Sequence, residues 1–176
     1  SNPVDINGDG TPDLAECTNS GGSPTTCRVH TGDGDGTFTL GSTFTISRIA
    51  NGFAFGDFDN DGVLDFVAGL DDDGDAGQAW FWSGTSFVGG LPTGGGVESF
   101  DVNPSVESGG DNDPGYGWMY PYDFNGDGNL DLIVSYMDPA FNTDRELVFA
   151  AGAGDGTFAV TGIDRSPSAV AAARRI

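Results

Sequence analysis

The residues best suited to chemistry are aspartates that recur in three short acidic segments. The segments cover residues 5–13, 57–65 and 123–131, and each follows the pattern Asp-x-[Asp/Asn]-x-Asp-Gly-x-x-Asp. A hard divalent cation requires six to eight oxygen ligands, and alternate residues of a tightly curled loop point their side chains inward. The glycine of the pattern allows a sharp turn that a side chain would obstruct. The pattern therefore predicts three cation-binding loops.

Each predicted loop offers four side-chain ligands, and the residue after the glycine would contribute its backbone carbonyl. The predicted ligands are Asp5, Asn7, Asp9, Thr11 and Asp13 in the first segment, Asp57, Asp59, Asp61, Val63 and Asp65 in the second, and Asp123, Asn125, Asp127, Asn129 and Asp131 in the third. All ligands are oxygens, which argues against zinc and copper, and magnesium prefers fewer protein ligands. We therefore expect calcium, about three ions in all. Plain Asp-Gly turns are the alternative, which three equivalent copies disfavour.

The segments that must position these loops have the pattern of short strands. Each acidic segment runs into an apolar stretch, and related turns follow at residues 34–38, 83–87 and 154–158. Short apolar segments at 44–46, 53–55, 80–82 and 147–149 favour strands. Four strands per repeat of roughly fifty residues is typical of propeller blades. We predict an all-β chain of about three four-stranded β-propeller-type blades, each with its calcium loop between the first two strands.

The predicted repeats cover residues 1–50, 51–115 and 116–167, and residues 168–176 form a spare leading strand. The first repeat lacks most of its leading strand, and residues 103–115 form an inserted polar loop. A helix over residues 168–175 is the alternative for the alanine-rich tail. Three arrangements remain open. The tail closes onto the first repeat, it completes a neighbouring copy, or the chain is a piece of a longer propeller.

The three acidic segments, the Phe55-Gly-Asp57 sequence and the Gly-Asp-Gly-Thr-Phe turns resemble FG-GAP or VCBS-type repeats. Such repeats occur in integrin α-chain β-propellers and in many bacterial surface proteins. The resemblance implies a propeller in which the loop between the first two strands of each blade binds calcium. It implies no single activity, because these propellers serve adhesion, carbohydrate binding and accessory roles. Such propellers usually have more blades than the three found here.

Cysteine usage and net charge limit the compartment and the partners. Cys17 and Cys27 flank a predicted hairpin over residues 16–28, which favours a disulfide and an oxidising compartment over two reduced buried thiols. The 176 residues include 27 acidic and 6 basic side chains, for a formal charge of −21. Such a surface repels nucleic acid and anionic membranes. We also expect no membrane insertion, since no apolar run approaches about 20 residues.

Other polar and aromatic residues are weaker candidates. The acidic runs 71–75 and 111–113 lack the full spacing and indicate solvated loops, and residues 32–36 indicate a hairpin turn. Six aromatic residues could form a sugar-stacking platform, although core packing is the default: Trp80, Trp82, Tyr116, Trp118, Tyr120 and Tyr122. We expect no enzyme, because His30 is the sole histidine, lysine is absent, and no catalytic triad can be assembled.

These observations favour a secreted or cell-surface calcium-binding β-propeller-like module with a structural or adhesive role, in which calcium stabilises the blades. A carbohydrate-binding, lectin-like module is one alternative. A self-assembling filament or oligomer subunit, joined by strand donation from the C-terminal tail, is another. The expected partners are calcium and, at the surface, a glycan, a protein ligand or copies of the chain itself.

Overall fold

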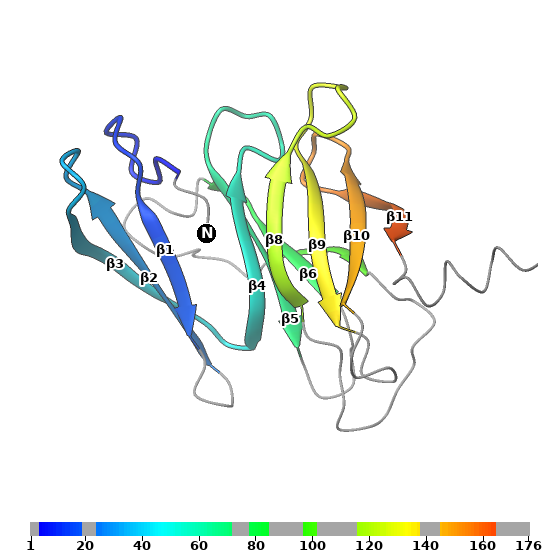
Figure 1. Ribbon diagram of the computed structural model, residues 1–176, viewed down its shortest axis with the longest axis horizontal. Coiled ribbons are helices and arrows are strands. Elements are labelled where there is room, and N and C mark those ends of the chain that lie inside the picture. Colours follow the sequence, from blue (N-terminus) through cyan, green and yellow to red (C-terminus); the bar gives the residue numbers. More distant parts are fainter. Residues whose placement is uncertain are drawn as a thin grey trace, which may run out of the picture.

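Three antiparallel sheets make up the part of the molecule that the computed structural model describes, which is residues 4–18, 24–71, 78–84, 97–101, 116–137 and 145–164 (Figure 1). Within these ranges the chain contains eleven strands and no α-helix. The prediction of an all-β chain is therefore confirmed for the described residues. No helix in these ranges is long and apolar enough to cross a membrane.

Within each sheet, every strand pairs with the strand next to it in sequence, so each sheet is a meander. Sheet 1 contains β1 (Leu14–Thr18), β2 (Thr25–Gly32) and β3 (Phe38–Ile46). Sheet 2 contains β4 (Ile49–Gly56), β5 (Asp65–Asp71), β6 (Gln78–Trp82) and β7 (Val97–Asp101). Sheet 3 contains β8 (Tyr116–Tyr122), β9 (Asp131–Met137), β10 (Arg145–Gly152) and β11 (Phe158–Asp164).

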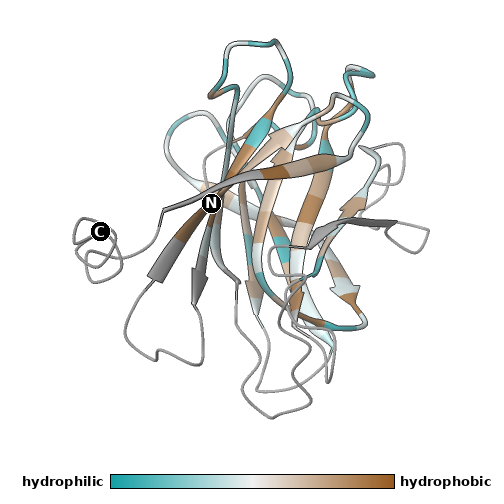
Figure 2. Cartoon of the chain, turned by 90° about the vertical axis from the view of Figure 1, so that its right-hand side faces the viewer, coloured by the Kyte–Doolittle hydropathy of each residue, from teal (hydrophilic) through white to brown (hydrophobic). Residues whose placement is uncertain are grey.

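Sheet 2 is covered on both of its faces, as β5 shows most clearly. Successive side chains of a strand point to opposite faces. Phe66 and Ala68 belong to a hydrophobic cluster shared with sheet 1, whereas Val67 belongs to a cluster shared with sheet 3. All three side chains are fully buried. The continuous apolar run of β5 is therefore explained by burial from both sides. Figure 2 shows hydrophobic residues along the strands and hydrophilic loops at the top of the view.

Aromatic rings fill both junctions between sheets. At the junction of sheets 1 and 2, the Phe44 and Phe66 rings meet edge to face, with 5.5 Å between centroids. At the junction of sheets 2 and 3, Phe58 and Phe158 also lie 5.5 Å apart. Edge-to-face ring pairs add about 0.5–1.5 kcal/mol beyond the burial of their area. These contacts hold the sheets in a fixed order along the molecule.

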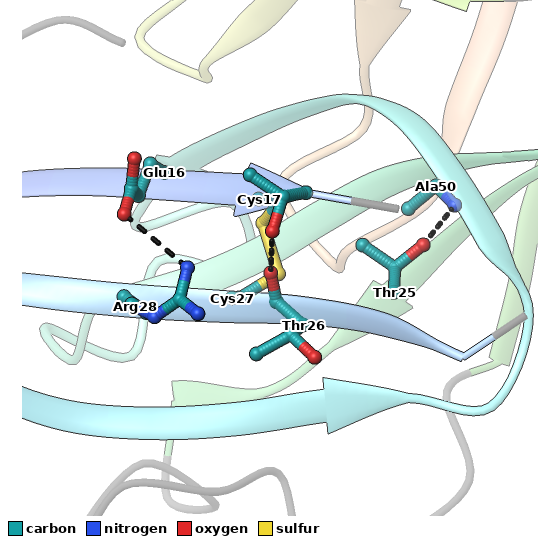
Figure 3. Close-up of a disulfide and its surroundings, with 8 residues drawn as sticks. Glu16, Cys17, Thr25, Thr26, Cys27, Arg28 and Ala50 are labelled. Carbon is teal, nitrogen blue, oxygen red and sulfur yellow. Dashed lines mark hydrogen bonds and ion pairs between the residues drawn. A yellow bond between two sulfur atoms is a disulfide. The ribbon is translucent and has the colours of Figure 1, made fainter. Parts of the chain in front are cut away.

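Sheet 1 is also tied to sheet 2 by polar contacts. The buried Thr25 hydroxyl accepts a 2.8 Å hydrogen bond from the Ala50 amide (Figure 3). The Arg48 guanidinium lies 5.0 Å from the centre of a Trp80 ring, at a cation–π distance. Because a buried hydroxyl without a partner would cost free energy, the bond at Thr25 favours one docking position of the two sheets.

The disulfide predicted from the sequence is present in the structure. Cys17 on β1 lies directly opposite Cys27 on β2, and their sulfurs are 2.07 Å apart (Figure 3). Cys27 is fully buried in the cluster between sheets 1 and 2. The bridge thus fixes the hairpin that forms one wall of this cluster.

Some features predicted from the sequence lie outside the described residues. They are the inserted loop 103–115 with the acidic run 111–113, most of the run 71–75, the end of the turn 83–87, the tail 168–176 and the side chain of Tyr116. On the side of β1 away from β2, the described residues contribute a single bridge, between Val4 and Asp13.

Replacement of both cysteines with serine should lower the free energy of unfolding by about 2–3 kcal/mol, the entropy estimate for a loop of this length. The sulfurs are 10 residues apart in sequence. Urea unfolding of the Cys17→Ser/Cys27→Ser variant against the oxidised wild type measures the difference. A thiol assay under denaturing, non-reducing conditions should detect no thiol in the wild type. A full complement of thiols, or equal urea midpoints, would contradict the prediction.

Candidate metal centres

The three acidic segments form loops at the same end of the molecule (Figure 1). Loop 1 (residues 5–13) precedes β1, loop 2 (57–65) connects β4 to β5, and loop 3 (123–131) connects β8 to β9. Each loop ends on an aspartate at the start of the next strand or immediately before it. The sheets therefore place three similar loops side by side in the order of the chain.

In loops 1 and 3 the first aspartate accepts hydrogen bonds from the backbone of its own loop. One Asp5 oxygen accepts the amides of Gly8 at 2.7 Å and Asp9 at 3.1 Å. The other oxygen accepts the Gly10 amide at 2.8 Å. The same three bonds recur at Asp123. These bonds curl each loop around a carboxylate.

The third and fifth positions of loop 1 are joined to each other. The Asn7 amide group donates to Asp9 at 2.8 Å, and the Asn7 carbonyl oxygen accepts the Asp9 amide at 2.9 Å. Hydrogen bonds from the Thr11 hydroxyl and amide, and then from Asn7, lower the pKa of Asp9. The side-chain pairing recurs between Asn125 and Asp127 in loop 3. The predicted ligands of loops 1 and 3 are thus already clustered.

The ninth position of each loop is a buried aspartate that binds backbone amides. In loop 2, one Asp65 oxygen accepts the amides of Phe58 at 2.7 Å and Asp59 at 3.3 Å. The other oxygen accepts the Gly84 amide at 2.6 Å. Asp13 and Asp131 make the equivalent three bonds, to Ile6, Asn7 and Gly32 and to Phe124, Asn125 and Gly152. Each of these aspartates therefore joins its loop to the hairpin of the same sheet.

The glycine donors in this arrangement were missed by the sequence analysis. A Cβ atom at Gly32, Gly84 or Gly152 would collide with a backbone carbonyl oxygen just before the ninth aspartate. Only glycine allows this close approach of the two backbones. A signal was present in the sequence, because a glycine follows each ninth aspartate after 19, 19 or 21 residues.

Loop 2 differs from the other two loops because its carboxylates have fewer internal partners. Carboxylate oxygens of Asp57, Asp59 and Asp61 all lie within 4.8 Å of one another. One oxygen of Asp57 is buried and has no hydrogen-bond partner. Its counterparts in Asp5 and Asp123 each accept two backbone amides. An unpaired buried acceptor is costly, so this oxygen is suited to bind a cation.

Loop 2 also differs from loops 1 and 3 in the residue at its fourth position, Asn60. Asn60 has a φ of 59°, a conformation that Gly8 and Gly126 adopt at this position in loops 1 and 3. The Asn60 side chain donates to the Asn129 side chain in loop 3 at 2.9 Å. Loops 2 and 3 are therefore in direct contact.

The electrostatics of loop 2 also favour the binding of a cation. Burial, and then the charges of Asp61 and Asp57, raise the pKa of Asp59. Burial raises the pKa of Asp65 to about 6, although the amides of Phe58 and Gly84 lower it in part. Clustered carboxylates resist ionisation unless a cation lies between them. A hard divalent cation would supply that charge.

The residues predicted to offer backbone carbonyls use their side chains in different ways. The Thr11 hydroxyl donates to the Gly32 carbonyl at 2.8 Å, and the Asn129 side chain accepts from Asn60. The Val63 side chain is partly exposed. No shared side-chain role links these three positions, as expected if only the main chain is required there.

The aromatic candidates separate into two groups. Trp82 is buried in the cluster between sheets 1 and 2, and Trp80 packs against that cluster. Trp118, Tyr120 and Tyr122 are 49 %, 44 % and 60 % exposed. The sole histidine, His30, lies 3.5 Å from Glu16 on the outer side of sheet 1. Trp80 and Trp82 therefore belong to core packing. The side chains of Trp118, Tyr120 and Tyr122 are accessible to a partner.

The ninth aspartate should be essential for stability even without metal. With a chelator present, Asp131→Asn should lower the free energy of unfolding by about 2 kcal/mol or more, because an amide group cannot accept all three backbone bonds. Asp127→Asn in the same loop should change it by less than about 0.5 kcal/mol, since Asp127 is exposed. Urea unfolding compares the two variants. Equal effects would show that Asp131 has no special structural role.

Comparison with known proteins gives one match to a family. No match was found among curated proteins or among solved structures. The model of the FG-GAP-like repeat matches residues 5–68, from the start of loop 1 through loop 2 to β5. This range contains two of the three acidic loops and the disulfide hairpin. Residues 5–68 of this chain are therefore similar to an FG-GAP-like repeat, in agreement with the resemblance noted in the sequence.

Proposed function

We propose that this chain is a calcium-binding, β-propeller-like module of the extracellular space or cell surface, with a structural or adhesive role. The observation that carries the proposal is the carboxylate cluster of Asp57, Asp59 and Asp61 in loop 2. Within this cluster, one buried oxygen of Asp57 lacks a partner. The proposal extends to loops 1 and 3, where the same ligand positions are clustered by hydrogen bonds.

Calcium fits the chemistry of the ligands. The candidate positions of the three loops offer only carboxylate, amide and carbonyl oxygens, and calcium accepts six to eight oxygens in flexible geometry. Three carboxylates within 4.8 Å repel one another until a cation binds. In loops 1 and 3, an ion would be added to carboxylates that already accept hydrogen bonds from their own loops. An ion would therefore relieve more repulsion between carboxylates in loop 2 than in loops 1 and 3.

Calcium at these loops would act on stability. For an extracellular-type Kd of about 0.1 mM and about 2 mM calcium, each site adds roughly 1.8 kcal/mol. Domains are stable by only about 5–15 kcal/mol, so three such sites would supply a substantial part. The effect would reach the sheets directly, because the ninth aspartate of each loop is hydrogen-bonded to a hairpin glycine.

Two further observations support a propeller-like module and its location in an oxidising compartment. The FG-GAP-like repeat and the face-to-face packing of three antiparallel sheets are compatible with a propeller-like array. The Cys17–Cys27 disulfide favours an oxidising compartment.

Removal of calcium should lower the melting temperature substantially, and added calcium should restore it. Asp59→Asn should weaken calcium binding at loop 2 at least tenfold, because it removes one carboxylate of the cluster. Isothermal titration of the chelator-treated protein with calcium measures the affinity, and calorimetry measures the melting temperature. Glu16→Gln, which changes the charge equally at an exposed position of β1, should alter neither quantity.

Two results would contradict the proposal. One is a melting temperature that does not respond to the chelator. The other is an Asp59→Asn variant that binds calcium with the same stoichiometry and affinity as the wild type. Titration with magnesium serves as the selectivity control, since magnesium keeps its water and binds such loops more weakly.

A further inference from the structure

The junction between sheets 2 and 3 provides a template for a contact whose two halves, a turn and its docking site, each occur once more in the chain. The turn between β10 and β11, here called turn 3 (residues 153–157), docks on loop 2. The Gly156 amide donates to the Phe58 carbonyl at 3.1 Å, and the Phe158 ring packs on the Phe58 ring. A Cβ atom at Gly156 would lie 2.6 Å from the Phe81 ring. Phe58 and Phe158 are only 2 % and 8 % exposed.

Sheet 1 carries an equivalent turn between β2 and β3, here called turn 1 (residues 33–37). The Asp33 amide donates to the Thr37 carbonyl at 3.0 Å, as the first residue of turn 3 donates to the last at 2.9 Å. The glycines of both turns have positive φ angles. However, no described atom lies near the Cβ position of Gly36, and the apolar side chains that follow, Phe38 and Leu40, are 44 % and 56 % exposed. Turn 1 has the shape of turn 3 without its docking site.

Sheet 3 carries the equivalent docking site. Phe124 occupies the position of Phe58, since each is the second residue of its loop and donates its amide to the ninth aspartate. Phe149 occupies the position of Phe81, because their strand partners both lie two residues after that aspartate. The Phe124 and Phe149 rings are 6.3 Å apart. Phe124 is 45 % exposed, whereas Phe58 is buried.

The first strand of sheet 3, β8, differs from the first strand of sheet 2, β4, in a way that suits contact with sheet 1. β4 and β8 lie side by side at the template junction (Figure 1). The small residues Ala54 and Gly56 face sheet 3 there, and a Cβ atom at Gly56 would lie 2.6 Å from Leu130. The corresponding residues of β8 are the exposed Tyr120 and Tyr122. These larger rings would fill the space beside a sheet that has no strand equivalent to β4.

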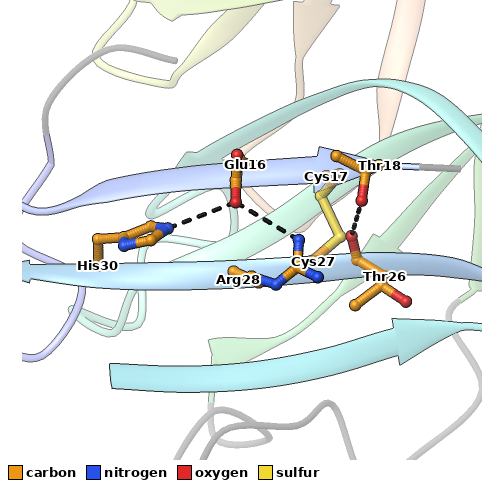
Figure 4. A network of polar contacts seen from close by, with 7 residues as sticks. All are labelled: Glu16, Cys17, Thr18, Thr26, Cys27, Arg28 and His30. Carbon is orange, nitrogen blue, oxygen red and sulfur yellow. Dashed lines mark hydrogen bonds and ion pairs between the residues drawn. A yellow bond between two sulfur atoms is a disulfide. The ribbon is translucent and has the colours of Figure 1, made fainter. Parts of the chain in front are cut away.

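Sheet 1 is such a sheet among the residues that the structure describes, because only Val4 pairs on that side of it. Its outer face carries Glu16, Arg28 and His30, which form a polar network (Figure 4). A guanidinium group stacks well on tyrosine and tryptophan rings, so Arg28 is suited to the exposed aromatic residues of β8.

We propose that copies of this chain associate head to tail, with turn 1 and Phe38 of one copy docked on Phe124 and Phe149 of the next. The described part of each chain forms three sheets, so two copies supply six, and propellers close with about four to eight. Two identical junctions therefore close a ring of two copies. The contact differs from strand donation by residues 168–176, which lie outside the described part of the chain.

Sedimentation velocity of the full chain in about 2 mM calcium, from about 1 µM to about 1 mM protein, tests the proposal. The expected mass rises with concentration to twice the 18.1 kDa of one chain. Phe38→Ser and Phe124→Ser should each weaken association at least tenfold, as loss of a central aromatic contact does. Ser47→Ala, at an exposed position between β3 and β4 that belongs to neither turn 1 nor its docking site, should leave association unchanged.

Mixing the two phenylalanine variants gives the most specific result. A pair made of one Phe38→Ser chain and one Phe124→Ser chain regains one intact junction, so the mixture should associate more tightly than either variant alone. Circular dichroism in the near ultraviolet verifies that each variant is folded. A single-chain mass at every concentration would overturn the proposal, as would dimers that persist in both variants or a mixture without recovery. Binding of a neutral glycan that depends on Phe124, with no dimer present, would assign this face to a sugar instead.

Discussion

The structure depends on one repeated interaction, a buried aspartate whose carboxylate accepts three backbone amides. Two amides belong to the loop that precedes the aspartate, and the third belongs to a glycine in the hairpin of the same sheet. Hydrogen bonds to an ionised acceptor are about twice as strong as neutral ones, and a carboxylate buried without them would be very costly. The interaction therefore connects the candidate metal loop to the strands that must hold it, and it occurs once in each sheet. Because of this connection, the shape of a loop and the stability of its sheet change together.

Much of this arrangement was predictable because it is encoded by local spacing. The positions of the three loops, the turns at residues 34–38 and 154–158 and the disulfide follow from residues that are close in sequence, and the structure contains each of them. The hydrogen bonds that the hairpin glycines donate to the ninth aspartates were not predicted. Asp13, Asp65 and Asp131 were assigned to the cation, and nothing in the loops themselves indicates that their carboxylates also bind distant glycines. That contact depends on how a hairpin folds back over its loop.

Burial of the aromatic residues was the least predictable feature. Phe58 and Phe124 occupy the same position of the same motif, yet one is buried and the other is nearly half exposed. The difference lies in the neighbouring sheet, which covers Phe58 through Phe158. Similarly, alternation along β8 places Trp118, Tyr120 and Tyr122 on one face, but periodicity cannot show whether another sheet lies against that face. Tertiary contacts between sheets decide these cases, and the sequence pattern within one repeat is almost identical in both.

The meander of each sheet has a consequence for the way the chain folds. Since every strand pairs with a sequence neighbour within its sheet, each backbone pairing joins adjacent segments of the chain, and the entropy lost on closing each hairpin is modest. A sheet can therefore form from one contiguous segment, and the next sheet can add to its exposed face without any rearrangement of the first. Stability in such a chain accumulates by nearest-neighbour steps, as in other repeat proteins. Gene duplication or loss of a whole repeat would leave the remaining hairpins intact, so the number of sheets can change in evolution without a new fold.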